Sequence, residues 1–259
     1  MLINRSELRS KHVPYILSLV VGLALLEIFA RILDVPYFPT VSGVFSRLMS
    51  LFAEGGIVID LFRSLQSLFL GFLIASILGI TIGILCGRYQ LIEHVLRPYI
   101  NTMVTAPSIL FVPIYFAVFG LSRWAIVALI VDYAVFFLIV STTTAVQSVD
   151  RELVEMSKVF GASERQRMRL ILLPSSTPLI FSALRIALTR AVKGMINGEL
   201  LIAVVGLGAR SKGFARAFDA EGVFAVATLV VGVALVSGAL LSFVDGRVNN
   251  WVPNIRRKG

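Results

Sequence analysis

Long apolar runs dominate the chain and are separated by short polar connections. Three of the runs, residues 64–87, 98–122 and 222–244, contain no Asp, Glu, Lys or Arg. Because about 20 apolar helical residues cross the hydrocarbon core of a bilayer, each run predicts a membrane-spanning helix. Three further runs are as long but carry charges, at residues 13–33, 124–149 and 178–205. The pattern predicts an all-α polytopic membrane protein with about six transmembrane helices, built as one transmembrane domain over residues 1–259.

The composition supports this fold class. Hydrophobic residues make up 57% of the chain and charged residues 15%, and the mean hydropathy is +0.89. These values lie outside the range of soluble globular domains. The first run could also be a cleaved secretory signal, but it is long, contains Glu27 and is not followed by a small-residue cleavage pattern. We therefore interpret it as a retained span.

The net charge of +9 is distributed unevenly between the two ends of the spans. An even number of spans places both termini on the same side. Lys and Arg are about twice as frequent on that side as on the other, which predicts that it faces the cytoplasm. We expect a protein of the plasma membrane, which in bacteria is the inner membrane, with both termini in the cytoplasm. We expect the chain to contact a lipid bilayer and not to bind nucleic acid.

Small residues recur at every fourth position of the second span. On a helix they form one stripe without bulk, which lets two backbones approach closely inside a membrane. We interpret the stripe as a helix-packing surface, within the chain or with a second copy; a pore-lining role is the alternative. The stripe consists of Ser67, Gly71, Ala75, Gly79, Gly83 and Gly87.

Prolines and an amphipathic run modify the picture at two places. Pro98, Pro107 and Pro113 predict that the third span is not one straight helix, but a short interfacial piece followed by a crossing after Pro107. Residues 41–52 have the pattern of an amphipathic helix at the external membrane surface.

The charged segment 150–177, which we call the elbow, predicts two short helices at the cytoplasmic surface. Gly161 ends the first, and Ser163 with Gln166 forms the capping-box signature of the second. Pro174 and Pro178 are expected to stop the second helix and start the fifth span. The elbow has two interpretations, a docking surface for a partner protein or a basic loop that only satisfies the positive-inside rule.

The elbow resembles the "EAA" signature of permease subunits of ATP-binding-cassette (ABC) importers. In that signature a Glu-Ala-Ala triplet is followed by Gly and then by Ile-x-Leu-Pro. Here the triplet position reads Glu155-Met156-Ser157, so the glutamate is kept and both alanines are replaced. Further matching pieces are "SLQSLFLGFLIASILGITIGILCGR", "APSILFVPIYFAVFGLSRWA" and "GELLIAVVGLG". The chain is similar to type I importer permeases of the subfamily for nitrate, sulfonate and taurine.

The resemblance implies a coupling helix that contacts a separate cytoplasmic ATPase subunit. It also implies a homodimer of this chain, two ABC ATPase subunits and an extracytoplasmic solute-binding protein as partners. ATP would be bound by the partner subunit, with no cofactor on this chain. The implied coupling residues are Glu155, Ser157, Gly161, Ala162, Ser163, Ile171, Leu173 and Pro174.

Motifs for catalysis are missing from the sequence. Residues 206–213 lack the glycine and hydroxyl residue that flank the lysine of a phosphate-binding loop. His12, His94 and Cys86 are too few to hold a structural zinc ion. We therefore expect no enzymatic activity and no metal, and ATP hydrolysis on a different polypeptide.

A charged side chain within a membrane span has a high energetic cost, so its presence indicates a function. Arg190, Lys193 and Asn197 share one face of the fifth span, with Glu199 close by in sequence. We hypothesise that these residues line a translocation path for a small anionic solute. Snorkelling to the cytoplasmic surface is the alternative. The acidic residues Glu27 and Asp132 are expected to pair with basic residues on neighbouring spans.

Two other functions remain open at this point. A secondary transporter driven by an ion gradient would show an inverted repeat or a membrane-embedded acidic pair, and neither is obvious. A membrane scaffold would have no role in transport.

Overall fold

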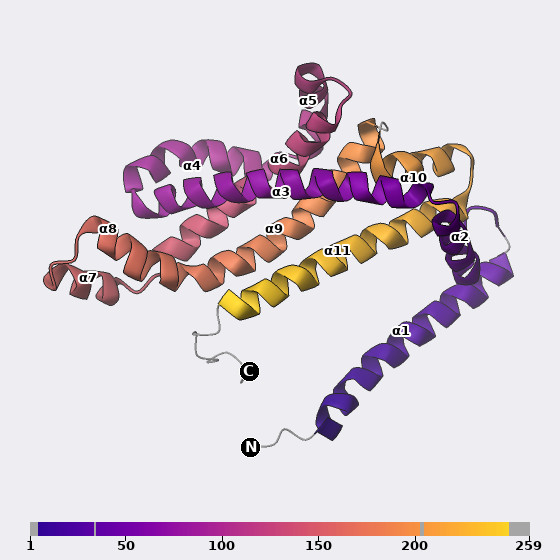
Figure 1. The fold of residues 1–259 in the computed structure, drawn as a ribbon, viewed down its shortest axis with the longest axis horizontal. Helices are drawn as coiled ribbons and strands as arrows, with labels where there is room; N and C mark the ends of the chain where they lie inside the picture. Colours follow the sequence, from indigo (N-terminus) through magenta and orange to yellow (C-terminus); the bar gives the residue numbers. More distant parts are fainter. Residues whose placement is uncertain (1–4, 34, 203–204, 249–259) are drawn as a thin grey trace.

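A computed structural model describes residues 5–33, 35–202 and 205–248, and these residues form helices joined by short connections without a strand. Three long helices form the centre: α3 (Gly56–Arg88), α6 (Arg123–Gln147) and α9 (Leu173–Ile202). Figure 1 shows them side by side, with α11 (Ala220–Val248) along one flank. Helix α6 lies between its two neighbours and supplies most of the core, because both of its broad faces are apolar.

The stripe of small residues lies in the contact between α3 and α6. A Cβ atom added at Gly79 would lie 2.5 Å from Leu138 Cβ, and one at Gly83 would lie 2.5 Å from Thr142 Cβ. Gly71 and Gly87 meet α6 in the same way, and Ala75 is fully buried. A side chain at any of these four glycines would push α3 and α6 apart. In this chain, therefore, the stripe faces a neighbouring helix and not an open channel.

Four helical segments of the described chain are long and apolar enough to cross a bilayer: α3, α6, the continuous segment from α8 into α9 (Glu164–Ile202), and α11. A fifth candidate is a bent pair made of α4 (Gln90–Thr105) and residues 108–119. The first predicted span falls within α1 (Arg5–Leu33), whose side chains are described only from Leu17 onward. The all-α polytopic fold is confirmed.

The third predicted span is broken, as its prolines indicate. Helix α4 is followed by a 3₁₀ turn, η1 (Ser108–Phe111), and by α5 (Val112–Phe119), at an angle of 96°. The break lies at Ala106-Pro107, whereas Pro98 is accommodated inside α4. A crossing after Pro107 stays a prediction, because the bent pair fits either a broken span or a re-entrant loop. Residues 108–119 reach only about 18 Å as a helix, less than the roughly 30 Å of a hydrocarbon core.

Pro174 and Pro178 do not separate the elbow from the fifth span. Helix α8 (Glu164–Arg167) passes into a π-helical turn, η2 (Met168–Leu172), and then directly into α9. In the turn, Leu173 N–H donates to the carbonyl of Met168, five residues back. Proline has no N–H and its ring clashes with the carbonyl four residues back. The wider π turn makes room for this ring, and the helix continues instead of stopping.

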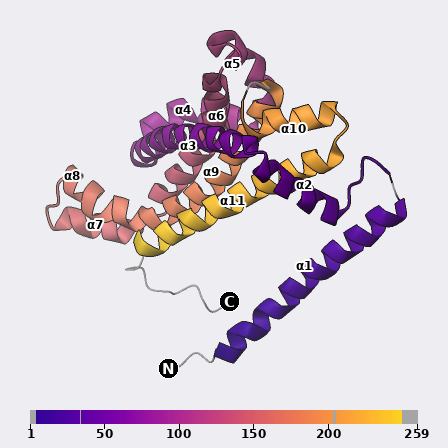
Figure 2. The same cartoon turned by 45° about the vertical axis from the view of Figure 1, so that its right-hand side comes forward.

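The ends of α1, α2 (Val41–Ala53), α10 (Gly206–Arg216) and α11 meet at one end of the molecule. Helix α2 forms as predicted, capped by Thr40, whose hydroxyl accepts from Gly43 N–H at 3.0 Å. Arg47 of α2 forms an ion pair with Asp219 at 2.9 Å, which joins α2 to the start of α11. In both views α1 stands apart from the bundle and approaches it near α2 (Figures 1 and 2).

Glu27 does not pair with a basic residue of a neighbouring span. Its carboxylate binds Arg31 one turn later in α1, at 2.7 Å, and accepts from the N–H and hydroxyl of Ser42. Free N–H groups at a helix start favour a negative charge, and α2 begins at this point. Glu27 thus connects α1 to α2.

Candidate coupling surface and translocation path

The elbow folds as two short helices joined by a tight turn. Helix α7 (Arg151–Val159) begins at Asp150, whose side chain accepts from Glu152 N–H at 2.9 Å. Gly161 has a φ of +74°, a region that glycine adopts readily and residues with a Cβ rarely do. Ser163 and Gln166 exchange both bonds of a capping box. The predicted helix, glycine turn and capped second helix are all present.

Ion pairs hold the elbow to the end of α3. Glu164 of α8 forms salt bridges with Arg88, the last residue of α3, and with Arg167. Ala162 N–H donates to the carbonyl of Ser157 at 2.9 Å, which closes the turn. The elbow is therefore fixed to two central helices, α3 through Arg88 and α9 through the π turn, and a force on it reaches both.

One side of the elbow exposes apolar side chains. Val159 is 86% exposed and Phe160 is 82% exposed, and Leu153 and Met156 are half exposed. These four residues, which we call the apolar tip, lie on α7 and at the residue that follows it. An exposed apolar cluster on a charged segment is typical of a protein interface.

The residues implied by the EAA resemblance fall into two groups. Glu155, Gly161 and Ser163 are exposed and accessible to a partner. Ser157 is buried, while Ala162, Ile171, Leu173 and Pro174 are half-buried. The residues of the second group pack inside the elbow and maintain its shape.

The polar residues predicted to share one face of α9 also differ in their exposure and contacts. Arg190 and Lys193 are exposed. The Arg190 guanidinium lies over the Phe137 ring, 4.4 Å from its centroid, and the Asn197 amide donates to Tyr133 Oη at 2.7 Å. Sequence reasoning missed these aromatic partners on α6, although their spacing of four residues places both on one helix face.

Glu199 lies elsewhere, contrary to the prediction that it lines a path. Its side chain is fully buried and accepts from Gly208 N–H at 2.8 Å. Ser64 of α3 accepts from Leu207 N–H at 2.9 Å in the same contact. Gly206, with a φ of +87°, lets the chain turn there. Glu199 and Ser64 thus satisfy the first N–H groups of α10, which explains why a glutamate precedes the Gly-Leu-Gly sequence.

Asp132 also departs from expectation, because no basic partner is described for it. The hydroxyl groups of Ser108 and Tyr115, from the segment beyond the Pro107 break, lie close to its carboxylate. Its Oδ2 atom is covered and has no hydrogen-bond partner among the described residues.

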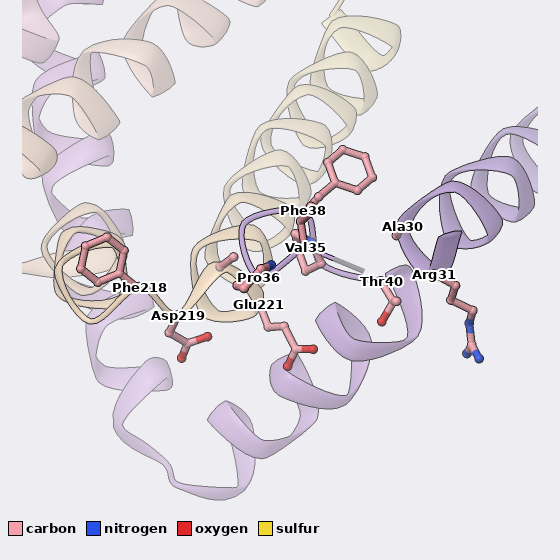
Figure 3. Close-up of a pocket in the computed structure, with 11 residues that line it drawn as sticks. Ala30, Arg31, Val35, Pro36, Phe38, Thr40, Phe218, Asp219 and Glu221 are labelled. Atoms are coloured by element: carbon pink, nitrogen blue, oxygen red, sulfur yellow. The ribbon is translucent and has the colours of Figure 1, made fainter. Parts of the chain in front are cut away.

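A pocket of about 470 Å³ lies where α1, α2 and the start of α11 meet. Figure 3 shows that three separate segments supply its walls, around Arg31, Pro36 and Asp219. Phe218 on its rim is 91% exposed and has a φ of +58°, an unusual conformation for a residue with a Cβ. A strained aromatic side chain directed away from the protein indicates a contact surface.

Sequence comparisons place these features in a known family. The family model described as "Binding-protein-dependent transport system inner membrane component" matches residues 79–250. The formylaminopyrimidine transport permease protein ThiX of Halalkalibacterium halodurans is 30% identical, over 87% of this chain and 90% of its own length. The nitrate import permease protein NrtB of Leptolyngbya laminosa is 30% identical, over 75% of this chain and 70% of its own length.

Solved structures show the same fold. An inward-facing form of the MetNI methionine ABC transporter has a TM-score of 0.63 at 19% identity, covering 74% of this chain and 93% of that one. An amino acid ABC transporter with histidines has a TM-score of 0.62 at 19% identity, covering 77% and 98%. The helices follow the type I importer arrangement, and the family match covers the elbow as well as the last three long helices. The chain belongs to the family of inner-membrane permease components of binding-protein-dependent ABC importers.

Proposed function

We propose that this permease subunit transmits the ATPase cycle to its membrane helices through the elbow. Membership of the family makes a secondary transporter or a scaffold untenable, and it leaves the coupling contact to be identified. The apolar tip carries the proposal. It is exposed, it lies on a charged segment, and salt bridges at Glu164 join that segment to α3. A rigid connection of this kind can convert closure of a partner into movement of α3 and α9.

The proposed assembly contains two copies of this chain, two ATPase subunits and an external solute-binding protein. ATP hydrolysis takes place on the ATPase subunits. The excess of Lys and Arg supports a cytoplasmic location for the termini and the elbow. The opposite end, with Phe218 and the pocket of Figure 3, then faces outward, where the solute-binding protein would dock.

The proposed solute is a small anion of the nitrate or sulfonate type. Arg190 and Lys193 support this, since both are exposed on a membrane helix, where a cation is costly unless it meets water, a partner or a ligand. The relative named for nitrate import agrees with this class. Glu199 is not part of the proposed path, because its buried carboxylate accepts a hydrogen bond from Gly208 N–H at the start of α10.

Co-purification tests the coupling contact. The tagged chain is extracted gently from native membranes, and the proteins bound to it are identified by mass spectrometry. Wild type is expected to bring an ABC ATPase, and Gly161→Val to lose it, because a β-branched residue cannot adopt the positive φ of the turn without strain. Gly161→Asn is the matched control, since asparagine tolerates this conformation.

The two variants also define the negative result. Retention of the ATPase by Gly161→Val, at the wild-type level of folded protein, would show that the elbow does not carry the contact. Absence of an ATPase from the wild-type preparation, in a detergent that preserves related complexes, would contradict the proposed assembly.

A further inference from the structure

A second cavity lies in the membrane region, between α5 and α6, with a volume near 460 Å³. Four aromatic side chains and one carboxylate contribute to its walls: Tyr115, Phe119, Trp124, Phe136 and Asp132. Ligand pockets typically combine an apolar lining with a few polar groups that fix the orientation of the ligand. This cavity has that composition, and its one charged group is acidic.

Asp132 is in an environment that a carboxylate rarely occupies without a partner. It lies in the middle of α6, eight residues and about 12 Å from Trp124 at the start of that helix. The hydroxyl groups of Ser108 and Tyr115 lie close to its carboxylate, and neither neutralises a charge. Oδ2 has no partner among the described residues. An ionisable residue within a span is energetically costly, and such residues commonly mark functional sites.

The break at Pro107 creates this arrangement. The 96° bend turns residues 108–119 back toward α6, so that Ser108 and Tyr115 reach Asp132. A straight continuation of α4 would carry both hydroxyl groups away from it. The shape of the cavity therefore depends on the position of residues 108–119 beside α6.

We propose that the cavity binds a small organic cation with a nitrogen-based charge, such as an ammonium or amidinium group. Asp132 accepts its N–H groups, and the aromatic side chains cover its apolar part, as cation–π contacts do elsewhere. The carboxylate repels an inorganic anion. The site is thus distinct from Arg190 and Lys193, which are exposed on α9 and would attract a group of opposite charge. It does not depend on the solute class proposed above.

Equilibrium binding of radiolabelled benzamidine tests the site, with the tagged chain and its co-purifying subunits held in lipid nanodiscs. At neutral pH the probe is a planar amidinium ion on an aromatic ring. Wild type is expected to bind it saturably. Benzamide, which is neutral, and benzoate, which is anionic, have nearly the same shape and are expected not to compete.

Asp132→Asn is expected to weaken benzamidine binding by roughly tenfold to a hundredfold, as loss of a charge-assisted hydrogen bond would. Glu54→Gln removes a carboxylate at the end of α2, far from the cavity in sequence, and is expected to leave binding unchanged. Equal competition by benzoate or benzamide would overturn the proposal without any variant. Unchanged affinity in Asp132→Asn would overturn it as well, and neither result bears on the ATPase contact tested above.

Discussion

At the scale of single residues, the α3–α6 contact depends on the absence of side chains. Gly83 faces Thr142, and an added Cβ would also lie 2.9 Å from the carbonyl of Ile139. Backbone atoms cannot move aside as the end of a flexible side chain can. The contact is therefore sensitive to one methyl group.

Gly83→Ala is expected to destabilise the protein by about 1–3 kcal/mol, the usual cost of overpacking a tight contact. Gly238→Ala is the matched control, because it lies on α11 with nothing within 4 Å of the added Cβ. Thermal unfolding in detergent, followed by loss of the monodisperse peak in size-exclusion chromatography, measures both. Equal stability of the two variants would contradict the packing role of the stripe.

Lys193 is the residue on which the proposed anionic solute depends. Lys193→Gln is expected to reduce uptake of labelled methanesulfonate roughly two- to fivefold, since a partly exposed charge contributes on the order of 0.5–1 kcal/mol. Lys212→Gln on α10 serves as the control. If cells take up methanesulfonate at the wild-type rate with Lys193→Gln, or take up neutral dimethyl sulfone equally well, the path is not selective for anions.

At the scale of elements, the attachment of the elbow rests on few interactions. Helix α7 is only nine residues long, and a helix of that length has little stability of its own. The capping box and the salt bridge from Arg88 to Glu164 compensate for this. The elbow should therefore loosen before the spans do.

Arg88→Gln is expected to increase hydrogen exchange across residues 151–167 while leaving α6 unchanged. Arg97→Gln removes a comparable charge from an ion pair within α4 and should have no effect on the elbow. Exchange followed by mass spectrometry on the protein in nanodiscs gives both values. Identical exchange of the elbow in the two variants would mean that Arg88 does not hold it.

The elements also show where sequence patterns reach their limit. The capping box and the glycine turn were predictable because each depends on residues no more than four positions apart. The π turn was not, because a proline signals a helix end, and only the continuous packing of α9 against α6 shows that the helix continues. The 96° bend was indicated by Pro107, but its direction toward Asp132 was not.

At the scale of the whole molecule, the charge distribution predicts which end of the protein faces the cytoplasm. Val159 on the elbow and Phe218 beside the outer pocket are among the most exposed side chains of the described chain. A cysteine at either site should react readily with a maleimide. The native Cys86 is buried and should not react.

A maleimide that cannot cross the plasma membrane is applied to intact cells whose outer layers have been made permeable to it. It is expected to label Phe218→Cys and to leave Val159→Cys unlabelled. Inverted membrane vesicles from which bound peripheral subunits have been stripped should reverse the result. Labelling is read as a mass shift on a gel. The opposite pattern would place the elbow outside and exclude contact with a cytoplasmic ATPase.

The sequence alone determined the fold class, the positions of the long helices, the elbow and the family. Apolar length, four-residue spacing and helix caps are local properties, and local properties can be read along the chain. Only the tertiary structure decided the partners of the polar residues. Glu27 binds the start of α2, Glu199 binds the start of α10, and Asp132 lies close to two hydroxyl groups beyond a break. These partners are 9 to 24 positions away in sequence, and no spacing rule connects them, because folding in three dimensions brings them together.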